Sequence, residues 1–186
     1  MSSIFEKLSM LRQLSFTDGE IRLLDNRMVI LPANILAAYT EKINESQELV
    51  LELYHSIKDS QIEGFAKLVG KSFSFSFNDF VKWMPDIFAL AGWGIIEYKE
   101  LDPDKHTATL TVARSPVATA LKGKVKTPVD HLIRGFIAGA ATAAFKVDID
   151  TIETECAALD AQACKFEFKP VEQFRSSPET LHQLGR

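Results

Sequence analysis

The sequence predicts one α+β domain in which an antiparallel sheet carries helices on one side. With 186 residues, of which 46% are hydrophobic, the chain can bury one sizeable core. Segments that alternate apolar and polar residues occur in clusters, and segments with helical spacing lie between the clusters. A parallel sheet would require strict alternation of strands and helices, so this order favours α+β.

The first 19 residues are expected to lead into the domain itself, which spans residues 20–170. Residues 3–14 place apolar side chains at helical spacing: Ile4, Leu8, Leu11 and Leu14. This spacing predicts a short amphipathic helix that packs on the domain or on a second copy of the chain.

A hairpin and a long helical region follow. Residues 19–32 read as two short strands that turn at Asp25-Asn26, and Pro32 suits the first turn of a helix. Helical spacing continues to about residue 71, with a break near Asn44. The buried side of this region is expected to be formed by five apolar residues: Leu49, Leu53, Ile57, Ile62 and Phe65.

The middle of the chain combines a helix with a second hairpin. Residues 72–76 are interpreted as a connector to a helix rich in large apolar side chains, which ends at Gly92-Trp93-Gly94. Two strands are expected at 95–101 and 107–112, followed by a short helix that begins at Ser115-Pro116.

A helix-start pattern occurs at Thr127-Pro128-Val129-Asp130, which offers a hydroxyl cap, a proline and a carboxylate in the first turn. The predicted helix carries Gly135 and Gly139 on one face. Each glycine costs about 1 kcal/mol relative to alanine inside a helix. Their position therefore predicts the close approach of a neighbouring strand or a bound molecule.

The only two cysteines of the chain lie in the last predicted hairpin. Its strands alternate apolar and charged residues, and folding at their connection brings Cys156 and Cys164 side by side, with Glu153 close to them. Two thiolates and a carboxylate can hold zinc if a fourth ligand comes from elsewhere. Two buried apolar thiols and a cross-strand disulfide are alternatives that the spacing leaves open. Residues 171–186 are expected to form a polar tail.

Two stretches carry a resemblance to a known family. They are the glycine-containing run Arg134-Gly135-Phe-Ile-Ala-Gly139-Ala-Ala-Thr-Ala-Ala-Phe145 and the motif Glu153-x2-Cys156-x7-Cys164-Lys-Phe166-Glu-Phe168. Together they resemble the C-terminal signature of the 4-vinyl reductase domain family, specifically over residues 128–169 and more weakly over 20–127. This family includes stand-alone hydrocarbon-binding proteins and the aromatic-sensing domains of phenol-responsive activators, and it is related in fold to transport-protein-particle subunits.

The resemblance implies a structural zinc site. In the phenol sensors the same Glu-x2-Cys-x7-Cys spacing belongs to such a site, and a cysteine near the start of the preceding helix is the fourth ligand. Here that position is Asp130, with His131 next to it, and either side chain can ligate zinc. Asp130 also suits a helix start without any metal, because a helix N-terminus favours negative charge.

The resemblance also implies a pocket for a small hydrophobic ligand, either aromatic or hydrocarbon. The chain contains 13 Phe, 2 Trp and 3 Tyr, most of which would otherwise be ordinary core residues. Four aromatic residues are expected to line the pocket: Trp83, Phe88, Trp93 and Phe136.

Sequence patterns of several enzyme classes are missing. The chain has no Gly-x-Gly-x-x-Gly after a strand, no complete phosphate-binding loop and no Gly-x-Ser-x-Gly elbow. A reductase would also need a hydride source, and no nucleotide or flavin pattern is present. The name of the family is therefore not evidence of activity, and a non-enzymatic role is favoured.

Three functions follow as hypotheses. The first is a non-enzymatic module that binds or senses a small hydrophobic ligand, with structural zinc. The second is an assembly subunit whose apolar cavity is permanently filled, and the third is a tetrapyrrole-related reductase accessory protein. The resemblance implies a homodimer.

Charge and hydropathy limit the environment and partners of the protein. A net charge of -4 argues against nucleic-acid binding, which needs a basic surface. No apolar run approaches the ~20 residues of a membrane span, and the N-terminus lacks a signal-peptide pattern, so a cytoplasmic location is expected.

Overall fold

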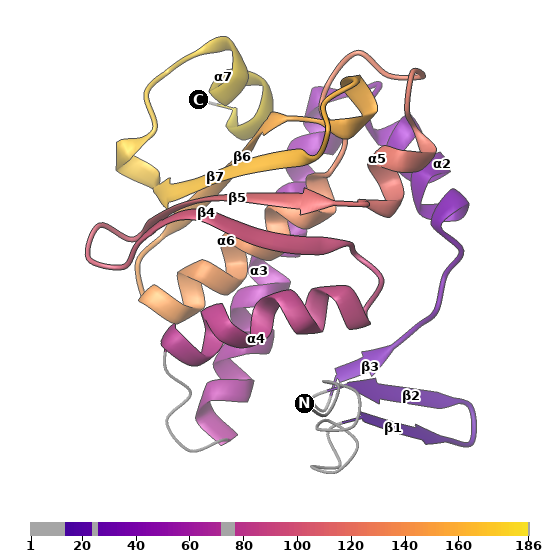
Figure 1. Cartoon of the computed structure of the whole chain (residues 1–186), viewed down its shortest axis with the longest axis vertical. Coiled ribbons are helices and arrows are strands. Elements are labelled where there is room, and N and C mark those ends of the chain that lie inside the picture. Colours follow the sequence, from indigo (N-terminus) through magenta and orange to yellow (C-terminus); the bar gives the residue numbers. More distant parts are fainter. Residues whose placement is uncertain (1–13, 24–25, 72–76, 186) are drawn as a thin grey trace.

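The computed structural model describes residues 14–23, 26–71 and 77–185, and it confirms the α+β class (Figure 1). Side chains are described for these residues except Leu14, Asn26, residues 65–71 and 77–80, and Trp83. The predicted connector at 72–76 lies outside the described residues. None of the described helices is apolar enough over a sufficient length to cross a membrane.

A four-stranded antiparallel sheet forms the centre of the fold. Its strands are β4 (Ile95–Asp102), β5 (Thr107–Ala113), β6 (Ile149–Glu155) and β7 (Cys164–Pro170), in the order β4-β5-β7-β6. Opposite residues of β5 and β7, such as Leu110 and Phe166, share one face of the sheet and are buried. The residues between them are only half-buried, so the period-two pattern of the sequence is that of a sheet covered on one face.

The helices that cover the sheet come from separate parts of the chain. α6 (His131–Phe145) packs on β6 and β7, α3 (Gln47–Lys71) packs on α6, and α4 (Phe77–Leu90) packs on β4. At one end of the molecule α2 (Ala33–Ile43) contacts α5 (Pro116–Ala120), whose first turn is capped by the Ser115 side chain. The break predicted near Asn44 separates α2 from α3.

The glycine face of α6 is the contact surface for α3. A Cβ at Gly135 would lie 2.8 Å from Ile57 Cβ and from the Tyr54 carbonyl oxygen, and one at Gly139 would overlap the Lys58 carbonyl oxygen. The predicted close approach is therefore present, but the neighbour is a helix and neither a strand nor a ligand.

The buried side of α3 differs from the predicted one. Leu49 is 45% exposed, whereas Val50, Tyr54 and Lys58 are buried. Tyr54 donates a hydrogen bond of 2.8 Å to Asp150 on β6, and the Lys58 ammonium lies 2.9 Å from the same carboxylate. The prediction considered only apolar residues and therefore missed the buried side of α3. The centre of that side is formed by Tyr54 and Lys58, which pair with Asp150 across the core. Phe65, the last residue of the predicted set, has no described side chain.

The N-terminal hairpin is confirmed as part of a small antiparallel sheet of β1 (Leu14–Thr17), β2 (Glu20–Leu23) and β3 (Asn26–Met28). Leu14 begins β1, so the predicted amphipathic helix does not extend to that residue. Residues 3–13 of the prediction lie outside the described residues. Pro32 directly precedes α2, as predicted.

Two local predictions near the C-terminal half need correction. α6 begins at His131 with Asp130 as its N-cap residue, so Thr127 is not the cap. The Thr127 hydroxyl accepts a hydrogen bond from Asn44 instead.

The expected polar tail contains two short helical segments, η2 (Val171–Gln173) and α7 (Pro178–Leu184). A capping box between Ser177 and Thr180 starts α7, whose Gln183 and Leu184 are buried against the body.

Candidate metal cluster and apolar cavity

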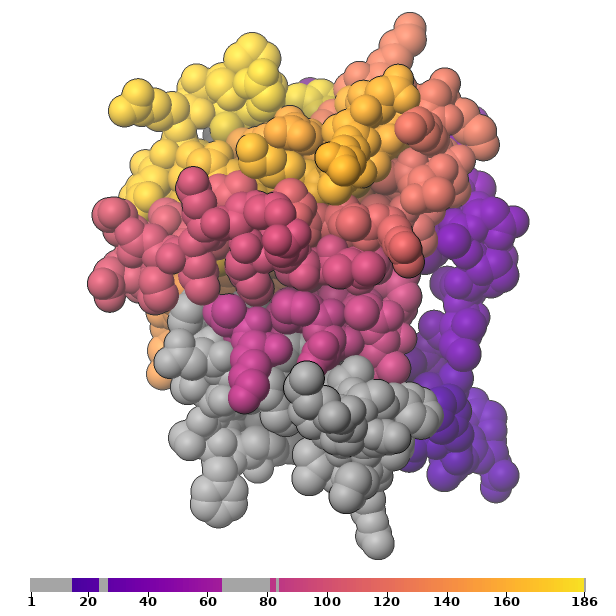
Figure 2. Space-filling view, in the orientation of Figure 1, coloured from indigo at the N-terminus to yellow at the C-terminus, as the bar shows by residue number. Residues whose placement is uncertain are grey.

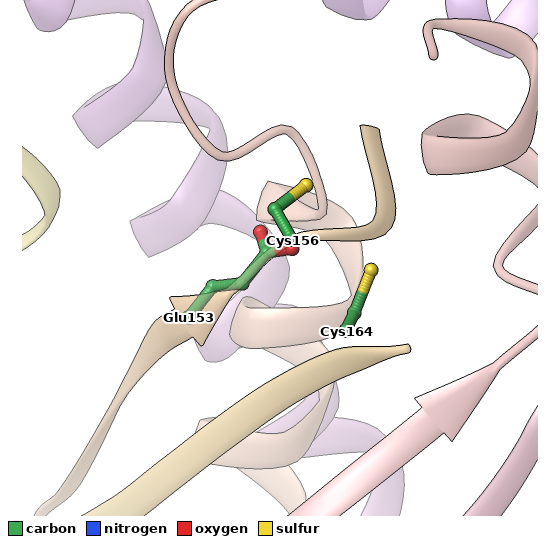
Figure 3. Close-up of side chains that lie close together, drawn as sticks. All are labelled: Glu153, Cys156 and Cys164. Carbon is green, nitrogen blue, oxygen red and sulfur yellow. The ribbon is translucent and has the colours of Figure 1, made fainter. Parts of the chain in front are cut away.

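The turn between β6 and β7 gathers the two cysteines and Glu153 (Figure 3). Glu153 lies at an irregularity near the end of β6, Cys156 precedes η1 (Ala157–Leu159), and Cys164 is the first residue of β7. Their ligand atoms all lie within 4.8 Å of one another, and all three side chains are buried. Both cysteines are free thiols. Two sulfur atoms and one carboxylate are a donor set that suits a soft or borderline divalent cation.

Asp130 adjoins this group from the start of α6. Its backbone N–H donates a 3.0 Å hydrogen bond to Glu153 Oε2, and its Oδ1 accepts one of 2.7 Å from the Ser115 hydroxyl. The remaining oxygens, Asp130 Oδ2 and Glu153 Oε1, are buried without a hydrogen-bond partner in the described part of the chain. Such buried polar atoms are costly, and a cation in the group would satisfy them.

The protonation of the group is strongly perturbed by its surroundings. Burial raises the pKa of Asp130 to about 6 and raises the pKa of Glu153 well above its usual range. The hydrogen bond with Cys164 lowers the pKa of Cys156 to about 6, and the same bond, with burial, raises the pKa of Cys164. Without a cation the group therefore retains protons that a bound cation would displace.

His131 is buried, and its ring contacts are with residues other than the thiols. Its Nε2 lies 2.6 Å from Asn44 Oδ1, and its Nδ1 lies 3.4 Å from a guanidinium nitrogen of Arg134. Burial lowers the pKa of His131 well below its usual value, so the ring is neutral. Both ring nitrogens are thus engaged between α6 and the α2–α3 break.

The backbone of Glu153 is held by a residue of α7. The Gln183 side chain accepts a 2.8 Å hydrogen bond from Glu153 N–H and donates one of 2.9 Å to Glu153 C=O. Arg134 also donates to the Gln183 carbonyl oxygen at 2.9 Å. Sequence reasoning missed Gln183, because it lies in a segment without a strong periodic pattern.

An apolar cavity of about 280 Å³ lies between α3, α4, α6 and the N-terminal sheet. Its described lining consists of eleven residues: Leu23, Met28, Ile57, Gln61, Ile87, Phe88, Ala91, Trp93, Leu132, Ile133 and Phe136. Three of the four predicted pocket residues, Phe88, Trp93 and Phe136, are among them. The side chain of the fourth, Trp83, lies outside the described part of the structure.

The aromatic lining residues contact one another. Phe88 and Phe136 meet edge to face with ring centroids 5.1 Å apart, and the Trp93 ring lies 6.5 Å from that of Phe88. The contributions of Leu23 and Met28 were missed, because no local pattern indicates that the N-terminal sheet lines a cavity together with the end of α4. Gln61 follows Ile57 by four residues, and this helical spacing is the signal that would have found it.

A second cavity of about 570 Å³ adjoins the first one. The two share Leu23, Met28, Ala91 and Trp93. The other walls of the second cavity come from the N-terminal sheet, residues 29–31, the start of α2, the end of α4 and the first residue of α5. In Figure 2 the indigo and purple N-terminal segment stands beside the magenta part of the body, and the surface is hollowed between them.

The family model of the 4-vinyl reductase domain matches residues 109–170. This stretch contains most of β5, all of α5 and α6, and the β6–β7 hairpin with its cluster. No curated protein matches the chain significantly.

Solved structures share the fold over most of the chain. The phenol-responsive sensory domain of the transcription activator PoxR, in a structure with phenol, is 18% identical with a TM-score of 0.76, and the match covers 94% of both chains. A vinyl-4-reductase family protein from Methanocaldococcus jannaschii is 19% identical with a TM-score of 0.51, and the match covers 77% of this chain and 84% of that protein.

A third neighbour comes from a different cellular system. Trafficking protein particle complex subunit 3 from Naegleria fowleri, covalently bound to palmitic acid, is 14% identical with a TM-score of 0.54. The match covers 77% of this chain and 93% of the subunit. The resemblance found in the sequence is thereby confirmed: residues 109–170 match the 4-vinyl reductase domain, within a fold shared by a phenol sensor, a vinyl-4-reductase family protein and a trafficking-complex subunit.

Proposed function

We propose that this protein is a non-enzymatic module that binds a small hydrophobic ligand in the cavity between α3, α4 and α6. The observation that carries the proposal is the cavity itself, whose described lining is almost entirely apolar and rich in aromatic rings. Walls of this kind are typical of small-molecule sites. An engineered cavity of about 150 Å³ binds benzene in another protein, so about 280 Å³ gives room for a monocyclic aromatic ligand.

The occupant in this proposal exchanges with solvent. A cysteine thiol is one attachment point for an acyl chain, but both cysteines of this chain belong to the Glu153 cluster. Neither is among the described residues that line the two cavities. A covalently held occupant, as in the Naegleria fowleri subunit, has no thiol among these lining residues to hold it.

Ligand binding is tested by isothermal titration calorimetry with phenol and toluene. Ala91→Trp places a large side chain on the wall that the two cavities share and is expected to weaken binding of both compounds at least about tenfold. Ala89→Trp is the matched control, because Ala89 is exposed like Ala91 but is not among the described residues that line either cavity. Equal binding by the wild-type protein and Ala91→Trp would show that the cavity is not the site.

The rate of exchange separates this function from that of an assembly subunit with a permanent occupant. Native mass spectrometry of the purified protein, before and after incubation with excess phenol, follows any co-purified molecule. A binding module releases the molecule as phenol enters. A molecule that stays in place would favour the assembly subunit.

We further propose that Glu153, Cys156 and Cys164 hold a structural zinc ion, with Asp130 as the fourth ligand. Their donor atoms suit zinc, and the unpartnered oxygens of Glu153 and Asp130 are the atoms that a cation would satisfy. His131 is the poorer candidate, because Asn44 and Arg134 occupy its ring nitrogens. Bound zinc would tie α6 to the β6–β7 turn and so stabilise the folded state.

The zinc proposal is tested by metal analysis of single variants. Cys156→Ser and Asp130→Ala are expected to lower the zinc content well below one ion per chain and to reduce the melting temperature. Gln162→Ala should retain both, because Gln162 is exposed in the same turn and its replacement removes no donor of the group. Full zinc content and unchanged stability in Cys156→Ser would refute the site.

A further inference from the structure

Gln61 differs in chemistry from the other residues that line the smaller cavity. It is the one side chain among the eleven described lining residues that carries an amide, a hydroxyl or a charge. Gln61 is half-buried, and its amide has no hydrogen-bond partner among the residues that the structure describes. An amide in apolar surroundings loses free energy unless it finds a partner.

The packing of α3 on α6 fixes where Gln61 lies. The Gln61 Cβ would be 2.7 Å from a Cβ on Gly139, and the Lys58 carbonyl oxygen of the preceding turn is closer still. Because Gly139 has no side chain, there is space next to it for the Cβ of Gln61. The position of Gln61 is a consequence of a tight helix contact, which is a firmer support than a surface loop would be.

The surrounding rings define what can lie next to this amide. Phe88, Trp93 and Phe136 line the same cavity and contact one another, so a flat aromatic ring can pack against them. An amide can both donate and accept a hydrogen bond, which suits a hydroxyl or amino group on that ring. A charged group would lose its hydration with only an uncharged amide to replace it.

We infer that Gln61 is a specificity-determining residue of the cavity. It selects uncharged aromatic molecules with one hydrogen-bonding substituent over hydrocarbons of the same size and over charged aromatics. This inference rests on the proposed ligand-binding function and adds to it the polar contact that distinguishes between ligands.

The test compares phenol with toluene, which is similar in size and lacks the hydroxyl. Dissociation constants for both are measured by calorimetry at pH 7 for the wild-type protein, Gln61→Leu, Gln61→Met and the control Ser60→Leu. Ser60 is exposed on the adjacent position of α3, so its replacement adds apolar surface outside the cavity. Circular dichroism establishes that each variant is folded.

The expected result is a change in preference and not a general loss of binding. Gln61→Leu and Gln61→Met each lower the affinity for phenol relative to toluene about tenfold, the value of one hydrogen bond at the upper end of its usual range. Ser60→Leu leaves the relative affinity unchanged. Benzoate binds the wild-type protein at least about 100-fold more weakly than phenol, because its carboxylate must be desolvated.

Two results overturn the inference in different ways. A phenol-to-toluene preference that stays within about twofold of wild type in both Gln61 variants refutes the role of Gln61 alone, because the lost hydrogen bond is worth more than that. Benzoate affinity equal to that of phenol refutes the selection against charge. If neither phenol nor toluene binds the wild-type protein, the proposed function fails, and this inference fails with it.

Discussion

The contact between α3 and α6 makes one substitution unusually informative. Gly139→Ala and Gly64→Ala both replace a glycine inside a helix, and alanine is favoured there by about 1 kcal/mol. A Cβ at Gly64 meets no atom within 4 Å, so Gly64→Ala should stabilise the protein by up to about 1 kcal/mol. A Cβ at Gly139 overlaps the Lys58 carbonyl oxygen and lies 2.7 Å from Gln61 Cβ.

The overlap at Gly139 involves backbone, so the two helices must separate to admit the new methyl group. Overpacking of this kind costs about 3 kcal/mol at the upper end of its usual range. After subtraction of the helix preference, Gly139→Ala should be less stable than wild type by roughly 2 kcal/mol. For a chain of this length that corresponds to a melting temperature about 4–8 °C lower.

The free energy of unfolding of both variants is measured by urea titration, with circular dichroism as the signal and with equal metal content in all samples. If Gly139→Ala is as stable as wild type, the glycine face does not set the spacing of the two helices. Gly139→Ala should also weaken the preference for phenol, because the methyl group displaces Gln61 from the cavity wall.

Two further predictions concern the cluster and its support. In metal-free protein the pKa of Asp130 is about 6 instead of the usual 3.8, so the folded state binds this proton more tightly than the unfolded chain does. The resulting stabilisation is present below about pH 4 and is lost as the pH rises through about 6. The loss of the contribution of Asp130 lowers the free energy of unfolding by roughly 3 kcal/mol over this range. Urea titrations of chelator-treated protein should show this fall, and Asp130→Asn should reduce it; an equal fall in both proteins would assign it to other groups. Gln183→Leu leaves the N–H and C=O of Glu153 without partners, so it should cost about 2–4 kcal/mol, whereas Gln173→Leu at an exposed position should cost less than about 0.5 kcal/mol. Similar melting temperatures for Gln183→Leu and Gln173→Leu would contradict the role of Gln183 in holding the backbone of Glu153.

Much of the fold could be predicted because its elements follow simple periods. The strands β5 and β7 alternate strictly, and the period-two pattern of β7 helped to locate the cysteine hairpin, whereas β6 is buried at five successive residues, 149–153. The buried side of α3 could not, because Tyr54 and Lys58 are polar residues whose shared partner, Asp150, lies 96 and 92 residues away in sequence. Pairs of that separation leave no local pattern.

The candidate site shows the same limit. Glu153, Cys156 and Cys164 belong to one short segment of the chain, so a single turn was enough to predict their meeting. The contribution of Gln61 depends on a glycine of another helix, and that of Gln183 depends on the docking of α7. Both require the tertiary arrangement, which the order of residues in a single helix does not contain.

The bonds from Gln183 to Glu153 have a consequence for synthesis and truncation. β6 is the outer strand of its sheet, and Gln183 follows Glu153 by 30 residues. A chain that stops at residue 170, where the family match ends, has every donor of the cluster but leaves the N–H and C=O of Glu153 on this strand without their partners. Open strand edges pair with other chains. Nascent or truncated chains of this length should therefore self-associate before α7 is present. In the complete fold α7 should reduce aggregation, because Gln183 occupies the backbone groups of Glu153.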